Sequence, residues 1–179
     1  MSCCSKSVPE FKFALTEAAG GDSKFLPSKA NETDTGWDVR CAEKNLIIEP
    51  FEYVKIKLGI RMFAPDGWWL ELRPRSSSHA KKHLNCLYGV IDNGYENELL
   101  LSAQYLPPIN SERQTFPAYL EYYAPALPLE INFGEAIAQV IPVKRREMKV
   151  VEVATEQFQE LCQQRAGSRG LGGFGSSGG

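Results

Sequence analysis

The feature that most limits how this chain can fold is a succession of short runs in which apolar and polar residues alternate. Alternation is clear at residues 11–15, 53–58 and 69–73, and it sends apolar side chains to one face of a strand and polar ones to the other. Residues 99–101 and 137–141 are more uniformly apolar, which predicts more deeply buried strands. Turn-forming residues separate the runs at 64–67, 92–94 and 132–134. Many short strands at close spacing predict an all-β barrel or sandwich.

Little helix is expected. Residues 78–84 are polar and suit one short helix. Residues 155–163 suit a second helix capped by Thr155, with Phe158, Leu161 and Cys162 on one face. Residues 106–127 are rich in Pro and Tyr and have no clear period, so we expect a surface excursion inserted between two strands.

The end of the chain differs in composition, because residues 167–179 contain seven glycines. Ordering such a segment costs backbone entropy, so it is either a disordered end or a flap that orders on a ligand. The whole chain of 179 residues suits one domain with its own core. We therefore predict a β-barrel domain at residues 1–164, including the insert, and a flexible arm at residues 165–179.

The charge balance and the cysteines limit the partners and the compartment. The formal net charge is -2, which argues against a nucleic-acid binder but leaves room for a small polyanion held by a local cluster of cations. The five cysteines include no Cys-x-x-Cys pair, so we expect reduced thiols rather than disulfides or a zinc site. No apolar run reaches membrane-spanning length and the first residues lack a signal-peptide core. A cytoplasmic, or at least intracellular, protein without a membrane partner is expected.

Three polar patches suggest a phosphate-binding site, although each has a simpler explanation. In the glycine-rich end, Arg169 and Phe174 suit a phosphate and a base, but the segment also resembles a low-complexity linker. Residues 73–78 (Arg-Pro-Arg-Ser-Ser-Ser) end a strand and offer hydroxyls and N–H groups to an anion, or simply cap a helix. Residues 87–99 read as two strands around a tight Asp-Asn-Gly turn, a hairpin whose backbone can read a pyrimidine edge.

Together with residues 35–38 (Thr-Gly-Trp-Asp) and 134–139 (Gly-Glu-Ala-Ile-Ala-Gln), these patches occur in an order that resembles the five motifs of the trimeric dUTPase family. The resemblance implies a β-barrel or jelly-roll subunit that hydrolyses dUTP to dUMP and pyrophosphate, which keeps uracil out of DNA. It also implies a homotrimer in which the C-terminal arm of one subunit closes over a site on another.

The resemblance assigns roles by position. Asp92 matches the carboxylate that activates water for attack on the α-phosphorus, and a carboxylate is ionised at neutral pH. Mg²⁺ is the implied cofactor, carried on the triphosphate, and Asp38 matches a residue that contacts the metal through water. The implied substrate-binding residues are Arg75, Ser76, Ser77, Cys86, Gly89, Val90, Ile91, Tyr95, Leu100, Gln139, Arg169, Phe174, Gly175, Ser176 and Ser177. Tyr95 would exclude a 2′-hydroxyl by stacking on the deoxyribose.

The chain departs from the family pattern at several positions. Gly94, Asn97 and Ala136 stand where many members carry Asp, Gly and Arg, and the insert at residues 106–127 exceeds the usual loop. Similar inserts occur in some phage-encoded members, so a viral source, or a host nucleus, stays open. Two alternatives are a bifunctional dCTP deaminase and dUTPase, and a dUTPase whose aromatic insert binds a regulatory protein. A trimer contact or a self-packed loop is the simpler role for the insert.

Overall fold

The computed structural model describes residues 8–108 and 127–164. The chain divides into a unit that ends at Arg145 and a second unit that begins at Arg146. All the strands among the described residues belong to the first unit, and the described part of the second contains the helix α2 (Thr155–Gln164). No helix among the described residues is long and apolar enough to cross a membrane.

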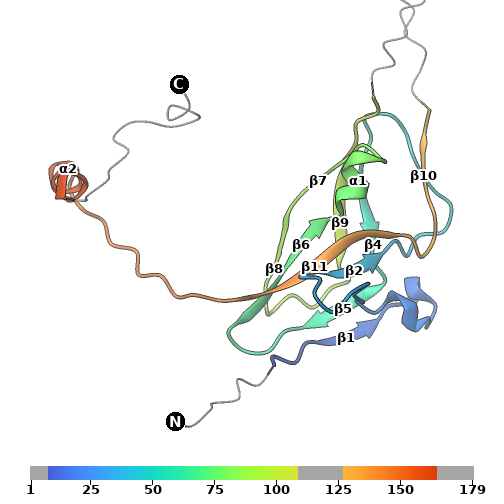
Figure 1. Cartoon of the computed structure of the whole chain (residues 1–179), viewed down its shortest axis with the longest axis horizontal. Coiled ribbons are helices and arrows are strands. Elements are labelled where there is room, and N and C mark those ends of the chain that lie inside the picture. The colour runs from blue at the N-terminus through green and yellow to red at the C-terminus, as the bar shows by residue number, and fades with distance from the viewer. Residues whose placement is uncertain (1–7, 109–126, 165–179) are drawn as a thin grey trace, which may run out of the picture. The chain divides into compact units, whose positions relative to one another are not determined.

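The first unit is built of short antiparallel strands (Figure 1). They are β1 (Lys12–Leu15), β2 (Trp37–Arg40), β3 (Leu46–Ile48), β4 (Tyr53–Lys57), β5 (Ile60–Phe63), β6 (Trp68–Pro74), β7 (Leu84–Cys86), β8 (Gly89–Ile91), β9 (Leu100–Tyr105), β10 (Leu129–Ile131) and β11 (Ala136–Lys144). Two 3₁₀ turns, η1 (Glu17–Ala19) and η2 (Ser23–Phe25), follow β1, and the helix α1 (Ser76–Ala80) follows β6.

Each ladder in this unit joins strands that are not consecutive in the chain. The sheets are ordered β1-β5, β10-β3, β2-β11-β6-β8 and β4-β9-β7. Such crossed connections are typical of jelly-roll folds rather than of meanders of hairpins. The predicted all-β, jelly-roll-like class is confirmed.

The core lies between these sheets and follows from the alternation seen in the sequence. In β6, Leu70 and Leu72 are buried while their neighbours are more exposed, and β9 buries Leu101, Ala103 and Tyr105 in the same way. The predicted deeper burial of residues 99–101 is confirmed, since Leu99 and Leu101 are buried and β9 contains no exposed residue, although its burial alternates along the strand. In β11 two consecutive residues, Ile137 and Ala138, are buried because a bulge shifts the register between Ala136 and Ala138.

The register of the four-stranded sheet decides which side chains lie together. Gln139 on β11 is directly opposite Asp38 on β2 and directly opposite Arg73 on β6. Because paired residues of antiparallel strands project to the same face, these three side chains share one face of the sheet. Leu72 and Val140 project to the other face, which is buried.

The helices differ from expectation in detail. The predicted helix at residues 78–84 is α1, which begins earlier, at Ser76, and ends at Ala80, because Leu84 is buried in β7 against β9. The second predicted helix is confirmed as α2. Thr155, however, is its first helical residue rather than its cap, since the Phe158 N–H donates to the Ala154 carbonyl.

The predicted tight hairpin around the Asp-Asn-Gly turn was wrong. β8 pairs with β6, whereas β9 pairs with β4 and β7, so the two runs that flank the turn belong to different sheets. The turn itself is present, closed by a 3.1 Å bond from the Tyr95 N–H to the Asp92 carbonyl. A wide hairpin does exist, but its arms are β7 and β9.

The predicted insert lies between β9 and β10. The Tyr105 hydroxyl donates to the Leu127 carbonyl at 3.1 Å, and the Leu106 N–H donates to the His83 carbonyl at 3.0 Å. Residues 109–126 of the insert lie outside the described residues.

Candidate active site

A polar pocket of about 270 Å³ opens where β2, β11 and the start of α1 converge. Six of its eight lining residues come from the sequence patches at residues 35–38, 73–78 and 134–139, and Ala30 and Asp34 come from the preceding loop. The lining residues are Ala30, Asp34, Thr35, Gly36, Asp38, Arg75, Ser76 and Gln139. Four predicted site residues, Asp38, Arg75, Ser76 and Gln139, are therefore brought together.

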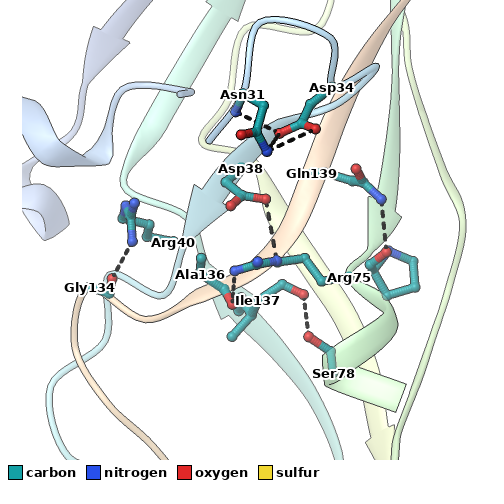
Figure 2. Close-up of polar contacts among 11 residues, drawn as sticks. Asn31, Asp34, Asp38, Arg40, Arg75, Ser78, Gly134, Ala136, Ile137 and Gln139 are labelled. Carbon is teal, nitrogen blue, oxygen red and sulfur yellow. Dashed lines mark hydrogen bonds and ion pairs between the residues drawn. The ribbon is translucent and has the colours of Figure 1, made fainter. Parts of the chain in front are cut away.

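Arg75 is the cation of this pocket. It occupies the N-cap position of α1, directly after β6, and its Nε lies 3.3 Å from Asp38 Oδ1. Its Nη1 donates to the Ala136 carbonyl at 3.4 Å, so the guanidinium is held from two sides (Figure 2). Both side chains of the Arg75–Asp38 pair are partly exposed, so the pair leaves guanidinium donors accessible to an anion.

The first turn of α1 is fastened to β11 at one carbonyl. The buried Ser78 hydroxyl donates to the Ile137 carbonyl at 2.6 Å, and the Arg75 N–H donates to the same oxygen at 3.2 Å. Ser76 and Ser77 are the first two residues of this helix, where backbone N–H groups have no partner within the helix. Ser78 thus fixes the backbone that presents Arg75 and Ser76 to the pocket, whereas Ser77, the next residue of the helix, does not line it.

Gln139 is placed by a close approach of the backbone at Gly36. A Cβ at position 36 would lie 2.2 Å from Gln139 Oε1 and 3.1 Å from Gln139 Cβ, so a larger residue would displace the Gln139 side chain. The Gln139 amide also reaches the Pro74 carbonyl at 3.5 Å. Glycine at position 36 is needed here for space rather than for its φ angle.

Next to Gly36, a turn at residues 31–34 holds the carboxylate of Asp34 at the edge of the pocket. Asp34 Oδ2 accepts from the Asn31 N–H at 2.9 Å, and the Asn31 side-chain amide lies within 3.5 Å of both Asp34 oxygens. Asp34 and Asn31 lie on the loop above Asp38 (Figure 2). Arg40, in contrast, points to the Gly134 carbonyl and does not line the pocket.

Apart from Ser77, the remaining described site residues form a second group along the chain, between the end of β7 and the start of β9, with the Asp92 turn among them. Gly89, Val90 and Ile91 make up β8, Cys86 ends β7 and Leu100 begins β9. Asp92 and Tyr95 are exposed, and the Tyr95 hydroxyl donates to the Glu98 carbonyl at 3.2 Å.

Burial raises the pKa of the Cys86 thiol to about 11. The thiol is therefore neutral near pH 7 and suits packing rather than nucleophilic chemistry. No chemical step needs to be assigned to it.

The two groups are far apart within one chain. Ile91 pairs with Leu70, near the start of β6, and Asp92 lies one residue beyond Ile91. Arg75 follows the last residue of β6, Pro74, at the other end of the strand. The stretch from Leu70 to Pro74 alone spans about 13 Å at roughly 3.3 Å per residue. Asp92 and the polar pocket therefore lie at opposite ends of one strand.

Sequence reasoning missed several residues of these two groups. Ser78, Asn93 and Glu98 matter through partners that are distant in the chain: Ile137 for Ser78, Pro65 for Asn93, and Thr16 and Gly59 for Glu98. The Asn-x-x-Asp spacing at residues 31–34 is a turn signal that could have identified Asp34. The predicted arm residues Arg169, Phe174, Gly175, Ser176 and Ser177 lie outside the described residues.

Comparison with known proteins connects this arrangement to one family. The dUTPase family profile matches residues 22–115. The deoxyuridine 5'-triphosphate nucleotidohydrolase of Mycobacterium marinum is 31% identical over 156 residues, covering 86% of this chain and 88% of that protein. The protein of the same name from Wolbachia pipientis wMel is 28% identical over 172 residues, covering 94% of this chain and 97% of that protein.

Solved structures agree with these matches. The Staphylococcus bacteriophage 80alpha dUTPase with dUPNHPP superposes with a TM-score of 0.69 at 26% identity, covering 95% of this chain and 99% of that chain. The dUTPase from phage phi11 of S. aureus, whose structure visualises a species-specific insert, superposes with a TM-score of 0.64 at 24% identity. It covers 80% of this chain and 96% of that chain and supports the fold.

Proposed function

This chain belongs to the dUTPase family, and from this premise we propose how its residues hydrolyse dUTP to dUMP and pyrophosphate. The activity is that of a dUTP diphosphatase. The observation that supports the proposal is a polar pocket in which Arg75, Ser76 and Gln139 present donors to one space, with Asp38 beside them.

We assign the triphosphate to this pocket. Arg75 supplies a planar set of donors for phosphate oxygens, and the backbone of Ser76 and Ser77 adds N–H groups at the start of α1. Gln139, with donor and acceptor on one amide, suits the reacting water or a phosphate oxygen. The uracil and deoxyribose are assigned to the second group, where Gly89, Val90 and Ile91, with Cys86 and Leu100 beside them, offer backbone groups, and Tyr95 offers a ring.

Asp92 is the proposed base. A carboxylate in this role accepts a proton from the water that attacks the α-phosphorus, and the leaving group is pyrophosphate. A general base must lie within hydrogen-bond reach of that water, yet Asp92 and Arg75 lie at opposite ends of β6. We therefore propose that Asp92 acts on a triphosphate held by Arg75 of another copy of the chain.

A contact that joins one end of β6 to the opposite end in the next copy is head-to-tail, and such contacts form a closed ring when the rotation between copies brings the last copy back to the first. Three copies are the assembly that the resemblance implies. Residues 165–179, with Arg169 and Phe174, are proposed to complete the site from a further copy by gripping the γ-phosphate and stacking on uracil.

Mg²⁺ is the proposed cofactor. Among the described residues, no three His, Cys, Asp or Glu side chains gather into a metal site. Asp38 offers one carboxylate at the pocket, already paired with Arg75. This donor set fits an ion that keeps most of its waters and arrives on the triphosphate. When bound, the ion would neutralise charge on the phosphate oxygens.

The test is pyrophosphate release from each of the four deoxynucleoside triphosphates, dUTP and UTP, with and without Mg²⁺. We expect release from dUTP that depends on Mg²⁺, and little from the others. Release from all of them at similar rates would contradict the proposed base and sugar recognition. Ammonia released from dCTP would favour the bifunctional deaminase alternative.

A further inference from the structure

The turn that carries Asp92 is attached to the rest of the sheet by a side chain that the proposed chemistry does not use. Asn93 Nδ2 donates to the Pro65 carbonyl at 3.1 Å, in a partly buried contact between residues that are 28 positions apart. We propose that Asn93 is a positioning residue that fixes Asp92 for proton transfer. This inference rests on the assignment of Asp92 as the base.

Asp92 lies between two attachment points. On one side the backbone ladder between β8 and β6 ends at the Ile91–Leu70 pair. On the other side Asn93 reaches the connection that leads into β6. The backbone pairing of β8 with β6 ends at Ile91. Beyond that point the Asn93 side chain attaches the same segment to the connection before β6.

The acceptor belongs to a well-fixed turn. The Pro65 carbonyl also accepts the Trp68 N–H at 3.1 Å, and Gly67 adopts a φ of 75° that suits glycine. The Gly67 carbonyl in turn accepts the Arg145 N–H at 2.7 Å, which ties the turn to the end of β11. A carbonyl can accept two hydrogen bonds, so loss of Asn93 leaves the turn itself intact.

The far end of the segment is anchored separately. Glu98 Oε1 accepts from the Thr16 hydroxyl at 2.8 Å and from the Gly59 N–H at 3.0 Å. Between these anchors, Asn97 is exposed and makes no side-chain hydrogen bond with any described residue. Removal of the Asn93 amide therefore takes away the attachment of the Asp92 turn to the Pro65 turn, while the backbone bond from Tyr95 to Asp92 remains and Glu98 still holds the segment in the fold.

The experiment compares Asn93→Ala and Asn93→Asp with the matched controls Asn97→Ala and Asn97→Asp. Asn93→Asp keeps the shape of the side chain but replaces the N–H donor with a carboxylate oxygen, an acceptor that cannot bond to the Pro65 carbonyl. We expect both Asn93 variants to lower kcat for dUTP about tenfold, since small misplacements of a reacting group cost up to about a hundredfold in rate. KM should stay within about twofold, because the phosphate pocket is unchanged. Both Asn97 variants should match the parent.

Two further measurements separate positioning from general damage. Affinity for a dUTP analogue with a non-hydrolysable α,β-linkage and the thermal unfolding midpoint should both be unchanged in Asn93→Ala. If Asn93→Ala lowers the affinity for the analogue and the unfolding midpoint together with kcat, the positioning role is overturned and a structural role is left. A parent-like kcat in Asn93→Ala would overturn it as well.

Asp92→Asn is measured alongside. If Asp92→Asn is inactive while Asn93→Ala is fully active, the inference about Asn93 fails and the proposed base stands. If Asp92→Asn turns over dUTP at the parent rate, the proposed base fails, and the positioning role fails with it.

Discussion

Arg75 continues directly from one end of β6, while Asp92 lies beyond the other end, one residue past the pair formed by Ile91 and Leu70. Arg75 faces a polar pocket with Asp38 at 3.3 Å, and Asp92 is exposed. If Arg75 binds phosphate and Asp92 accepts the proton, as we propose, the two residues of one chain cannot act on the same triphosphate across a strand of about 13 Å or more. The geometry of one chain therefore supports a site shared between copies.

Replacement of Arg75 by lysine tests the phosphate pocket. Lysine keeps the charge but cannot contact Asp38, Ala136 and a phosphate through one planar group. We expect KM for dUTP to rise about tenfold, equivalent to about 1.4 kcal/mol of binding free energy. The free energy of unfolding should change little because the Arg75–Asp38 pair is partly exposed.

Arg61→Lys is the matched control for this change, since Arg61 is an exposed arginine on β5 in a different sheet. Steady-state kinetics of the two variants give the comparison. A KM that is unchanged in Arg75→Lys, or that rises equally in both variants, would contradict the assignment of phosphates to this pocket.

Gly36→Ala tests the placement of Gln139. The new Cβ would lie 2.2 Å from Gln139 Oε1, so the amide must move out of its position at the pocket. We expect kcat/KM to fall about tenfold because small displacements of groups at a reacting centre are costly. In a Gln139→Ala background the same change should cost less than about twofold, since a double-mutant cycle isolates the coupling of the pair. Equal losses in both backgrounds would show that Gly36 acts independently of Gln139.

The buried thiol of Cys41 predicts a loss of stability at alkaline pH. Burial raises the pKa of Cys41 to about 11, whereas an unfolded thiol titrates near about 8.5. Between these values the unfolded state binds fewer protons, so the free energy of unfolding falls as pH rises. Below the unfolded value the contribution of the thiol is fully present.

Urea unfolding of the parent and of Cys41→Ala at pH 8 and pH 10.5 gives the measurement. The parent should be the more stable at the lower pH, and its advantage should shrink at the higher pH. Because Cys86 is retained in both proteins, its own titration cancels in the comparison. An advantage that stays constant would mean that the Cys41 thiol is not shielded in the native state.

The strands were predictable because alternation is a local property. Asp38, Arg75, Ser76 and Gln139 of the polar pocket were predictable because each belongs to a short motif that resembles one of the dUTPase family. The strand with which β8 pairs was not predictable from the sequence. An Asp-Asn-Gly turn favours pairing of the two strands that flank it. Here, however, Leu99 is buried, and Glu98 accepts bonds from Thr16 and Gly59, so the strand after the turn enters another sheet. Such contacts depend on residues distant in the chain, which a local pattern does not reveal.

The same reason explains which site residues escaped notice. Asn93 reads in the sequence as a turn residue, and its amide gains a role only because Pro65 lies opposite it. Ser78 reads as part of a serine run, yet it alone among the three serines is buried and bonded to Ile137. Position in the fold, rather than residue type, distinguishes these side chains from their neighbours.

The shared site is tested most directly by mixing two inactive variants. Asp92→Asn lacks the proposed base and Arg75→Ala lacks the proposed phosphate-binding cation, so each should be nearly inactive when it is assembled alone. The two variants are unfolded, mixed in equal amounts and refolded together, and dUTP hydrolysis is measured.

If Asp92 and Arg75 of each site come from different copies, random assembly makes about a quarter of the sites complete, and about a quarter of the parent turnover returns. If both residues of a site came from one chain, no site in the mixture would be complete. Activity no higher than that of the separate variants, in mixed assemblies of confirmed composition, would contradict the account.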